Sequence, residues 1–411
     1  MRGLAVLALA LLTPASAWAT PPARDLAIVG ATVYATPEAA PVENATVVVH
    51  NGRIVAVGPK VRPPKGAEVI EAKGQVVTAG FWNSHVHLIS PTDRKEAKAP
   101  AAALNAELQG MLTRWGFTTV FDIASGPGDA IAIRGRIASG EVTGPNILTV
   151  DMPFYPKNGT PIYVRELAKT MPSCEISDPA SAAERARRQI AAGANGVKLF
   201  TGAIVGPPQG ILPMKLDDAK AVVAAAHALG KPAFTHPSNN IGLNVAIDAG
   251  VDILAHTTPD GGPWPADMAG RLKAHNMALI PTLTLWHSEL DKQKAPKDRI
   301  DRFEAVAQGQ LKAYSDIGGQ ILFGTDVGYT DVFDTTEEYR LMAGAGLTWR
   351  QILAALTTAP AQRFGFPKKG KVAVGDDGDL VILAADPATN PEAFAKVRAT
   401  IRAGQVIYRA P

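Results

Sequence analysis

The sequence predicts an α/β fold in which a (β/α)₈ barrel of the TIM type carries a small β-sandwich domain formed from both chain ends. Short apolar runs alternate with longer Ala-rich helical stretches in the middle of the chain. Runs rich in β-formers and separated by turn signals occur only at the two ends. The chain of 411 residues, 46% of them hydrophobic, also has enough apolar material for a large core.

Residues 1–19 have the features of a cleavable signal peptide. Arg2 is their only charge, an apolar run follows at 4–12, and Ala17-Trp18-Ala19 satisfies the A-x-A cleavage rule. The run is too short to cross a hydrocarbon core of ~30 Å, and a buried N-terminal helix or strand is the alternative. We therefore expect a periplasmic or secreted protein, cleaved after Ala19, with no stable membrane anchor.

The terminal regions, residues 20–76 and 366–411, are expected to build one split β-sandwich, because neither has enough strands to bury a face alone. The dipeptide Asn51-Gly52 predicts a tight hairpin between two of its strands. The expected strands are Leu26–Val29, Ala45–Val49, Arg53–Val57, Lys371–Val374, Asp379–Leu383 and Gln405–Tyr408.

Residues 77–365 are expected to form the barrel. Helical stretches such as Ala182–Ala192 and Leu216–Leu229 separate the strands, and several end at a glycine that suits a helix C-cap. A doubly wound sheet is the alternative, but no G-x-G-x-x-G motif follows a strand. The eight expected strands are the run from Val76 to Phe81, then Thr118–Phe121, Ile147–Val150, Gly196–Phe200, Pro232–Phe234, Val251–Ala255, Ala278–Pro281 and Gln320–Phe323.

Side chains able to bind a metal follow five of these strands, at the end of a barrel where active sites lie. Two histidines at i and i+2 point to one face of a strand, so both imidazoles can reach one ion. Taken singly, each residue has a structural explanation, such as a helix N-cap for an Asp or a snorkelling Lys. Their occurrence in barrel order predicts a metal site. The residues are His85, His87, Lys198, His236, His256 and Asp326.

These motifs resemble those of the amidohydrolase superfamily of metal-dependent hydrolases, in particular its prolidase-like and imidazolonepropionase-like branch. The resemblance covers nearly the whole chain after residue 19. One departure is Asn83, where many relatives have Asp just before the H-x-H segment, a change that could alter contacts around the ligands. The motifs are Ser84-His85-Val86-His87, Gly196-Val197-Lys198, Thr235-His236, Ala255-His256 and Gly324-Thr325-Asp326.

The resemblance implies two metal ions. His85, His87 and Asp326 would hold the more buried ion and His236 with His256 the more exposed one. Lys198 would be carbamylated by carbon dioxide and bridge them, and its apolar neighbours favour the neutral amine that this reaction needs. A metal-activated hydroxide would attack the substrate, with Asp326 as the catalytic proton carrier. Such ligands suit Zn²⁺, and other divalent metals are possible.

The leading hypothesis is an amidohydrolase that cleaves a carbon–nitrogen bond in a small substrate such as a dipeptide or an N-acyl amino acid. Residues of the loops after the third and seventh strands, Arg165, Tyr163 and His287, are candidates for binding that substrate. Two alternatives remain open. One is a mononuclear imidazolone-type cyclic amide hydrolase or deaminase, and the other is a non-catalytic periplasmic metal or small-molecule binding protein.

The charge and cysteine counts exclude other functions. The net charge of +3 is not concentrated in any stretch, so we expect no nucleic-acid partner. Cys174 is the only cysteine, which excludes an intrachain disulfide and a Cys-based zinc site, and we interpret it as a bystander. A homo-oligomer is possible, but the sequence shows no interface.

Overall fold

The structure is a computed structural model that describes residues 25–88 and 96–411. The signal peptide expected at residues 1–19 lies outside these described residues. Within them, no helix combines the length and the hydropathy that a membrane crossing requires.

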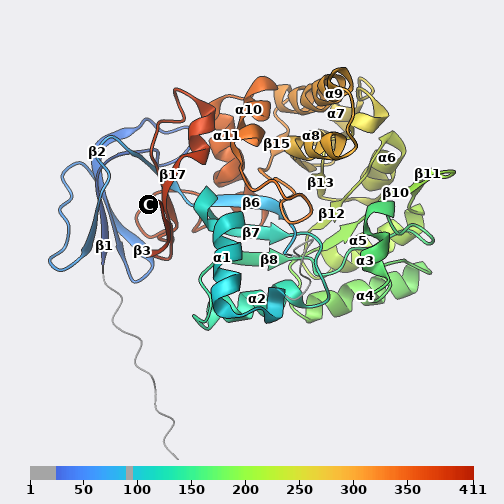
Figure 1. Cartoon of the computed structure of the whole chain (residues 1–411), viewed down its shortest axis with the longest axis horizontal. Helices are drawn as coiled ribbons and strands as arrows, with labels where there is room; N and C mark the ends of the chain where they lie inside the picture. Colours follow the sequence, from blue (N-terminus) through green and yellow to red (C-terminus); the bar gives the residue numbers. More distant parts are fainter. Residues whose placement is uncertain (1–24, 89–95) are drawn as a thin grey trace, which may run out of the picture.

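Eight parallel strands form the centre of a TIM-barrel-like domain (Figure 1). They belong to a three-stranded sheet, β6-β7-β8, and a five-stranded sheet, β9-β12-β13-β14-β15. Single bridges, Val86 to Val327 and Phe154 to Leu199, connect the edges of the two sheets, so the ring is barrel-like and not one continuous sheet. The strands are β6 Phe81–Val86, β7 Phe117–Asp122, β8 Asn146–Thr149, β9 Val197–Leu199, β12 Ala233–Thr235, β13 Ile253–Ala255, β14 Ala278–Ile280 and β15 Gln320–Ile321.

Helices follow each of these strands and pack around the outside, as the alternating sequence pattern predicts (Figure 1). The expected glycine cap is present after α6, where Gly250 has a φ of 78°. The helices are α1 Ala101–Met111, α2 Asp129–Ala138, α3 Arg165–Ala168, α4 Pro179–Ala191, α5 Leu216–His227, α6 Asn240–Ala249, α7 Met268–Ala274, α8 Leu283–Lys292, α9 Lys297–Asp316, α10 Thr336–Gly344, α11 Trp349–Leu356 and α12 Thr358–Arg363.

Strands from both chain ends form one eight-stranded sheet beside the barrel, with the order β18-β17-β16-β5-β1-β2-β3 and β4 paired to β1. Its apolar residues form a core cluster of their own. Pairing from both termini is thus confirmed, whereas a sandwich of two sheets is not. The strands are β1 Leu26–Val33, β2 Val42–His50, β3 Arg53–Gly58, β4 Glu68–Glu71, β5 Val76–Ala79, β16 Leu380–Leu383, β17 Val397–Arg402 and β18 Gln405–Arg409.

The expected run from Val76 to Phe81 is divided between the two sheets. β5 pairs with β1 and β16 in the terminal sheet, and the barrel begins only at Phe81. Gly80 lies at the junction, where a Cβ would come within 2.2 Å of the Thr118 hydroxyl. Close packing of two sheets at this point therefore requires glycine.

Two other differences concern the terminal and inserted segments. The strand expected at Lys371–Val374 is wrong, because this segment forms no ladder and Val372 only donates its N–H to the Ala35 carbonyl. A hairpin, β10 Gly202–Gly206 with β11 Gly210–Pro213, follows β9 and was not expected from the sequence. The predicted hairpin at Asn51-Gly52 is confirmed, with both residues at positive φ between the paired residues His50 and Arg53.

Candidate metal centre

The most tightly connected part of the site is formed by two histidines of β6 and one carboxylate beyond β15. The Nε2 atoms of His85 and His87 each lie 2.8 Å from Oδ1 of Asp326. His85 is fully buried and Asp326 nearly so. One ligand atom from each of the three residues lies within 4.8 Å of the others, so the group could hold one metal ion.

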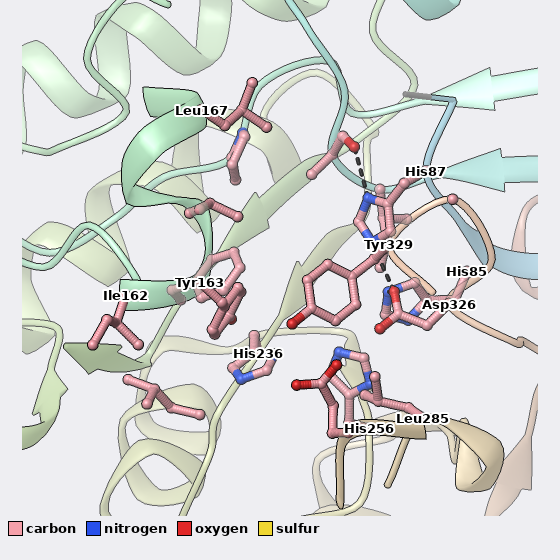
Figure 2. A pocket seen from close by; sticks show the side chains of 18 of the residues that line it. His85, His87, Ile162, Tyr163, Leu167, His236, His256, Leu285, Asp326 and Tyr329 are labelled. Atoms are coloured by element: carbon pink, nitrogen blue, oxygen red, sulfur yellow. Dashed lines mark hydrogen bonds and ion pairs between the residues drawn. The ribbon is translucent and has the colours of Figure 1, made fainter. Parts of the chain in front are cut away.

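The other three candidate residues converge on the same point from β9, β12 and β13. The imidazole centroids of His85 and His256 are 4.5 Å apart, and those of His236 and His256 are 4.8 Å apart. His236 stacks on Phe200 with a centroid separation of 4.9 Å. Lys198 is buried in β9 and lines the same cavity, and the charge of Asp326 acts on its ammonium group. The structure therefore brings together all six residues singled out in the sequence, since all of them line this cavity, and Figure 2 shows His85, His87, His236, His256 and Asp326.

Several buried polar atoms at this centre have no hydrogen-bond partner among the described residues. These atoms are Nδ1 and Nε2 of His85 and Nε2 of His236. Leaving a buried polar group unpaired costs ~1–3 kcal/mol, and such groups call for an explanation, an ion among them. Imidazole nitrogens with free lone pairs, close to a carboxylate, are the donor set that a divalent metal of the zinc type prefers.

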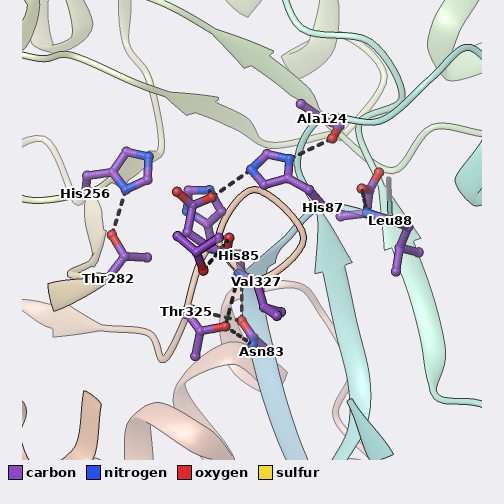
Figure 3. Close-up of polar contacts among 12 residues, drawn as sticks. Asn83, His85, His87, Leu88, Ala124, His256, Thr282, Thr325 and Val327 are labelled. Atoms are coloured by element: carbon purple, nitrogen blue, oxygen red, sulfur yellow. Dashed lines mark hydrogen bonds and ion pairs between the residues drawn. The ribbon is translucent and has the colours of Figure 1, made fainter. Parts of the chain in front are cut away.

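Hydrogen bonds from the surroundings orient two of the imidazoles (Figure 3). His87 Nδ1 donates to the Ala124 carbonyl at 2.6 Å, so in the neutral ring the lone pair is on Nε2, the atom that faces Asp326. His256 Nδ1 lies 2.6 Å from the Thr282 hydroxyl. Neither partner carries a motif, so the sequence analysis did not find them.

Asn83 holds the β6 and β15 ends together. Its Nδ2 donates to the Thr325 hydroxyl at 2.8 Å, and its Oδ1 accepts from the backbone N–H of His85 and of Thr325 (Figure 3). An aspartate in its place could accept from the same N–H groups and also from the Thr325 hydroxyl. The departure noted in the sequence therefore reverses one hydrogen bond and keeps the connection between the two strand ends.

Burial controls the protonation of the histidines. It lowers the pKa of His85 to about 3 and that of His236 to about 3, and it holds the pKa of His256 well below its usual value. These rings are therefore neutral at pH 7, as metal ligands must be. Burial alone would lower the pKa of His87 as well. The hydrogen bond and the charge of Asp326 act in the opposite direction, and the pKa of His87 is raised.

The pKa values of Lys198 and Asp326 are shifted in directions that suit a reactive site. Burial among apolar side chains lowers the pKa of Lys198 to about 7, although the charge of Asp326 acts in the opposite direction. Burial disfavours the ionised Asp326, but the neighbouring His85 and His87 outweigh it and hold its pKa well below the usual value. A fraction of Lys198 is therefore a neutral amine near pH 7, while Asp326 is a carboxylate.

Three residues of the centre have left-handed backbone conformations, with φ of 75° at His256, 62° at Asp326 and 44° at Thr282. Such conformations are unfavourable for residues other than glycine and concentrate at functional sites. At Thr282, hydrogen bonds hold the two residues that follow it. The buried carboxylate of Glu338 on α10 accepts hydrogen bonds from the N–H groups of Leu283 and Thr284, the first residues after it. Glu338 thereby fixes the start of α8 and the position of Thr282.

A cavity of about 680 Å³ opens above the metal centre. Apolar and aromatic side chains make up most of its wall, and Tyr163, Ile162 and Leu167 lie across it from His87 and Asp326 (Figure 2). Tyr163 meets Tyr329 edge-on at 5.4 Å between ring centroids. The cavity is large enough for a small-molecule substrate with an apolar part.

The structure places the three candidate substrate residues differently. Tyr163 lines the cavity. Arg165 is exposed, donates to the Val205 carbonyl at 3.0 Å and does not line the cavity as described. His287 also lies outside the cavity wall and instead contacts Glu304 and Glu337. Tyr329, which the sequence analysis did not single out, lines the cavity three residues after Asp326.

Cys174 also lines this cavity, and burial raises the pKa of its thiol to about 11. The thiol is protonated at neutral pH, so it is a poor nucleophile, in agreement with its interpretation as a bystander.

Comparisons with known proteins place these features in context. A model described as the amidohydrolase family matches residues 76–407. Among solved structures, a Xaa-Pro dipeptidase with bound methionine in the active site matches with a TM-score of 0.78 at 19% identity, over 94% of this chain and 100% of that one. A prolidase complexed with N-methylphosphonate-L-proline matches with a TM-score of 0.77 at 21% identity, over 94% of this chain and 100% of that one. At these identities, the two structures show likeness of fold.

Curated relatives match less of the chain. An uncharacterized protein of Mycobacterium tuberculosis is 28% identical over 225 residues, which are 52% of this chain and 57% of the relative. The match thus spans little more than half the length of that relative.

Proposed function

The chain belongs to the amidohydrolase family. We propose that it is a hydrolase of carbon–nitrogen bonds that cleaves the amide bond of a small substrate with an apolar part, such as a dipeptide or an N-acyl amino acid. The observation that carries this proposal is the convergence of His85, His87, Lys198, His236, His256 and Asp326 beneath a largely apolar cavity. The dipeptidase and prolidase likenesses support the choice of substrate class.

The residues of the centre fit the divalent metals that the family generally uses. His85, His87 and Asp326 would hold one ion, and His236 with His256 a second. His85 Nδ1 and His236 Nε2 support this assignment, because no hydrogen bond among the described residues satisfies these two buried nitrogens. When bound, such metals lower the pKa of water and polarise the scissile carbonyl.

Lys198 would bridge the two metal positions as a carbamate. Its neutral amine attacks carbon dioxide, a C–N bond forms, and the ammonium proton is released to solvent, so that the neutral side chain becomes an anionic oxygen donor. The pKa of about 7 supports this step, because an amine with the ordinary value of 10.5 would be almost wholly protonated at neutral pH.

Asp326 would carry the proton from the attacking water to the leaving nitrogen. It is an ionised carboxylate at the centre, so it can accept a proton during attack and give it up when the C–N bond breaks. The aromatic wall formed by Tyr163 and Tyr329 would hold the apolar part of the substrate and exclude water from the opposite side.

Metal content per chain tests this proposal, measured on the purified protein supplied with zinc and bicarbonate, beside Lys198→Ala. We expect about two zinc ions at this centre per wild-type chain, besides any ion bound elsewhere in the chain, and fewer in the variant, with hydrolysis of members of a dipeptide and N-acyl amino acid library by the wild type alone. One ion at this centre, unchanged in Lys198→Ala, would favour the mononuclear cyclic amide hydrolase or deaminase instead. A folded protein that binds no metal would contradict the proposal.

A further inference from the structure

A second group of metal-ligand side chains lies outside the cavity, where three helices meet. It consists of His287 on α8, Glu304 on α9 and Glu337 on α10. His287 Nδ1 is 2.9 Å from Oε1 of Glu304 and 3.1 Å from Oε1 of Glu337. One ligand atom from each residue lies within 4.8 Å of the others, the same spacing that defines the group of His85, His87 and Asp326.

The atoms that meet here are buried but make no hydrogen bond. His287 Nδ1 and Glu304 Oε1 are inaccessible to solvent and unpartnered, although only 2.9 Å separates them. An N–H aimed at the carboxylate would satisfy both atoms, so the arrangement lacks the geometry of a proton-bridged pair. His85 Nε2 shows the same combination, an ion-pair distance to Asp326 without a hydrogen bond.

The charges of this cluster also favour a cation. Glu304 and Glu337 place two carboxylate oxygens around one imidazole nitrogen, and 83% and 71% of their side chains are buried, since 17% and 29% are exposed. Arg340 contacts Glu337 at 2.8 Å, but it is half exposed and lies on the same helix. Glu304 has no cationic partner among the ion pairs of the described residues other than His287. With a neutral imidazole, the two carboxylates and Arg340 together have a net charge of about −1.

We propose that His287, Glu304 and Glu337 form a second divalent-cation site, distinct from the metal centre in the cavity. One imidazole nitrogen and two carboxylates make a mixed donor set that suits Zn²⁺ and similar metals of intermediate softness. Each ligand comes from a different helix, so a bound ion ties α8, α9 and α10 together.

The position of α8 gives this site a role. Leu285, Trp286 and Glu289 of α8 line the substrate cavity, and His287 lies between them on another face of the helix. The bound cation fixes α8 from outside and thereby stabilises that part of the cavity wall. This role does not depend on the proposed catalytic chemistry, because none of the three ligands touches the cavity as described.

The test is zinc binding by the metal-free full-length protein and its variants. We expect His287→Gln and Glu304→Gln each to bind one zinc ion fewer per chain than the wild type in equilibrium dialysis. The exposed control Glu184→Gln on α4 should bind as many ions as the wild type. Asp326→Asn should retain this ion, which separates the site from the metal centre and from the proposed function.

Thermal denaturation of Asp326→Asn supplies a second measurement that does not require a change in the cluster. We expect Zn²⁺ to raise its Tm, and we expect Asp326→Asn combined with Glu337→Gln to lose most of that increase. Unchanged zinc stoichiometry in both His287→Gln and Glu304→Gln would overturn the proposal. The proposal would also be overturned if Zn²⁺ had no effect on Tm and the cluster stabilised the protein only at acidic pH. In that case a proton, and not a metal ion, would bridge the three side chains.

Discussion

Burial of Lys198 destabilises the metal-free protein, and the same burial favours the neutral amine that the proposed carbamate requires. Its ammonium group is buried, 5.7 Å from the centroid of the Phe200 ring, where charge is poorly solvated. The same burial that disfavours the ammonium leaves a neutral amine near pH 7. The proposed reactivity toward carbon dioxide would therefore follow from a local destabilisation, as is common at functional sites.

We predict that Lys198→Met stabilises the metal-free protein at and below pH 7. The folded-state pKa of Lys198 is about 7 and the ordinary value is 10.5, so the unfolded chain binds more protons between these values. Stability of the wild type should therefore rise with pH from about 7 to about 10.5, and the full penalty applies below 7. The gain amounts to several kcal/mol, because each pKa unit corresponds to ~1.4 kcal/mol.

Urea unfolding at a series of pH values, in metal-free buffer purged of carbon dioxide, measures this effect. The difference in unfolding free energy between Lys198→Met and the wild type should shrink as the pH rises above about 7. A difference that stays constant across this range would show that burial does not shift the pKa of Lys198.

A second residue-scale prediction concerns Thr282, whose hydroxyl lies 2.6 Å from His256 Nδ1. Thr282→Val keeps the shape of the side chain and removes the partner that the described residues provide for that nitrogen. We expect metal affinity to fall by ~10–100-fold, as is usual when the partner of a ligating histidine is lost. Thr282→Ser retains the hydroxyl and should bind metal nearly as the wild type does, and equal loss in both variants would contradict the orienting role.

At the level of single residues, the sequence predicted the candidate ligands better than the residues around them. His85, His87, His236, His256 and Asp326 could be found because strand ends have a recognisable pattern and a known position in a barrel. The partners of these residues could not. Thr282 and the Ala124 carbonyl act through contacts that no local pattern encodes.

At the scale of elements, the start of α8 depends on a side chain from another helix. Glu338 on α10 is completely buried and accepts from Leu283 N, Thr284 N and the Thr284 hydroxyl. Burial raises its pKa to about 7 despite these hydrogen bonds. The first N–H groups of a helix lack partners within the helix, so an acceptor supplied by α10 couples the two elements.

We predict that Glu338→Gln destabilises the protein by ~1–3 kcal/mol at pH 8, because a carboxamide presents N–H groups to at least one donor that the carboxylate satisfies. The shift of α8 should also weaken metal binding, since Thr282 precedes the helix. Chemical denaturation and zinc titration of Glu338→Gln would measure both effects. Glu184→Gln on the exposed face of α4 is the control, and equal behaviour of the two variants would contradict the coupling.

The sequence predicted where the strands lie more reliably than it predicted which segments they contact. Seven of the eight expected barrel runs coincide with barrel strands, because continuous apolar runs mark strands buried on both faces. The division of β5 from β6 at Gly80 was missed, because it depends on the approach of Thr118. His287 was assigned to the substrate because it follows the seventh strand, yet successive helix residues point about 100° apart, and Trp286 lines the cavity whereas His287 does not.

At the scale of the whole molecule, the terminal sheet and the barrel share one continuous apolar core. Tyr34, Val381, Leu383 and Phe394, from segments at both chain ends, belong to the same buried cluster as the barrel helices. Thr400 in β17 adds a polar connection, with its hydroxyl donating to the Thr113 carbonyl at 2.6 Å. The sequence predicted the pairing of the termini but not this contact, because apolar periodicity identifies a buried face and not its partner.

We predict that the sheet and the barrel unfold together, and that Phe394→Ala destabilises both. Phe394 is fully buried, with its ring centroid 5.9 Å from that of Phe81 in β6 and 5.4 Å from that of Tyr339 in α10. Removing this ring leaves a cavity between the two parts and costs ~3–5 kcal/mol.

Two probes in one denaturation experiment test the coupling. Tryptophan fluorescence reports on Trp82 and Trp286 in the barrel, and amide hydrogen exchange in β1 and β2 reports on the terminal sheet. Since Tyr34, Val381, Leu383 and Phe394 belong to the core of the barrel, the midpoints of both probes should coincide in the wild type and shift equally in Phe394→Ala. The coupling would be contradicted if the amides of β1 and β2 exchanged at a lower free energy than that of barrel unfolding, and if Phe394→Ala changed only one of these two free energies. The terminal sheet and the barrel would then be separate folding units that dock against each other.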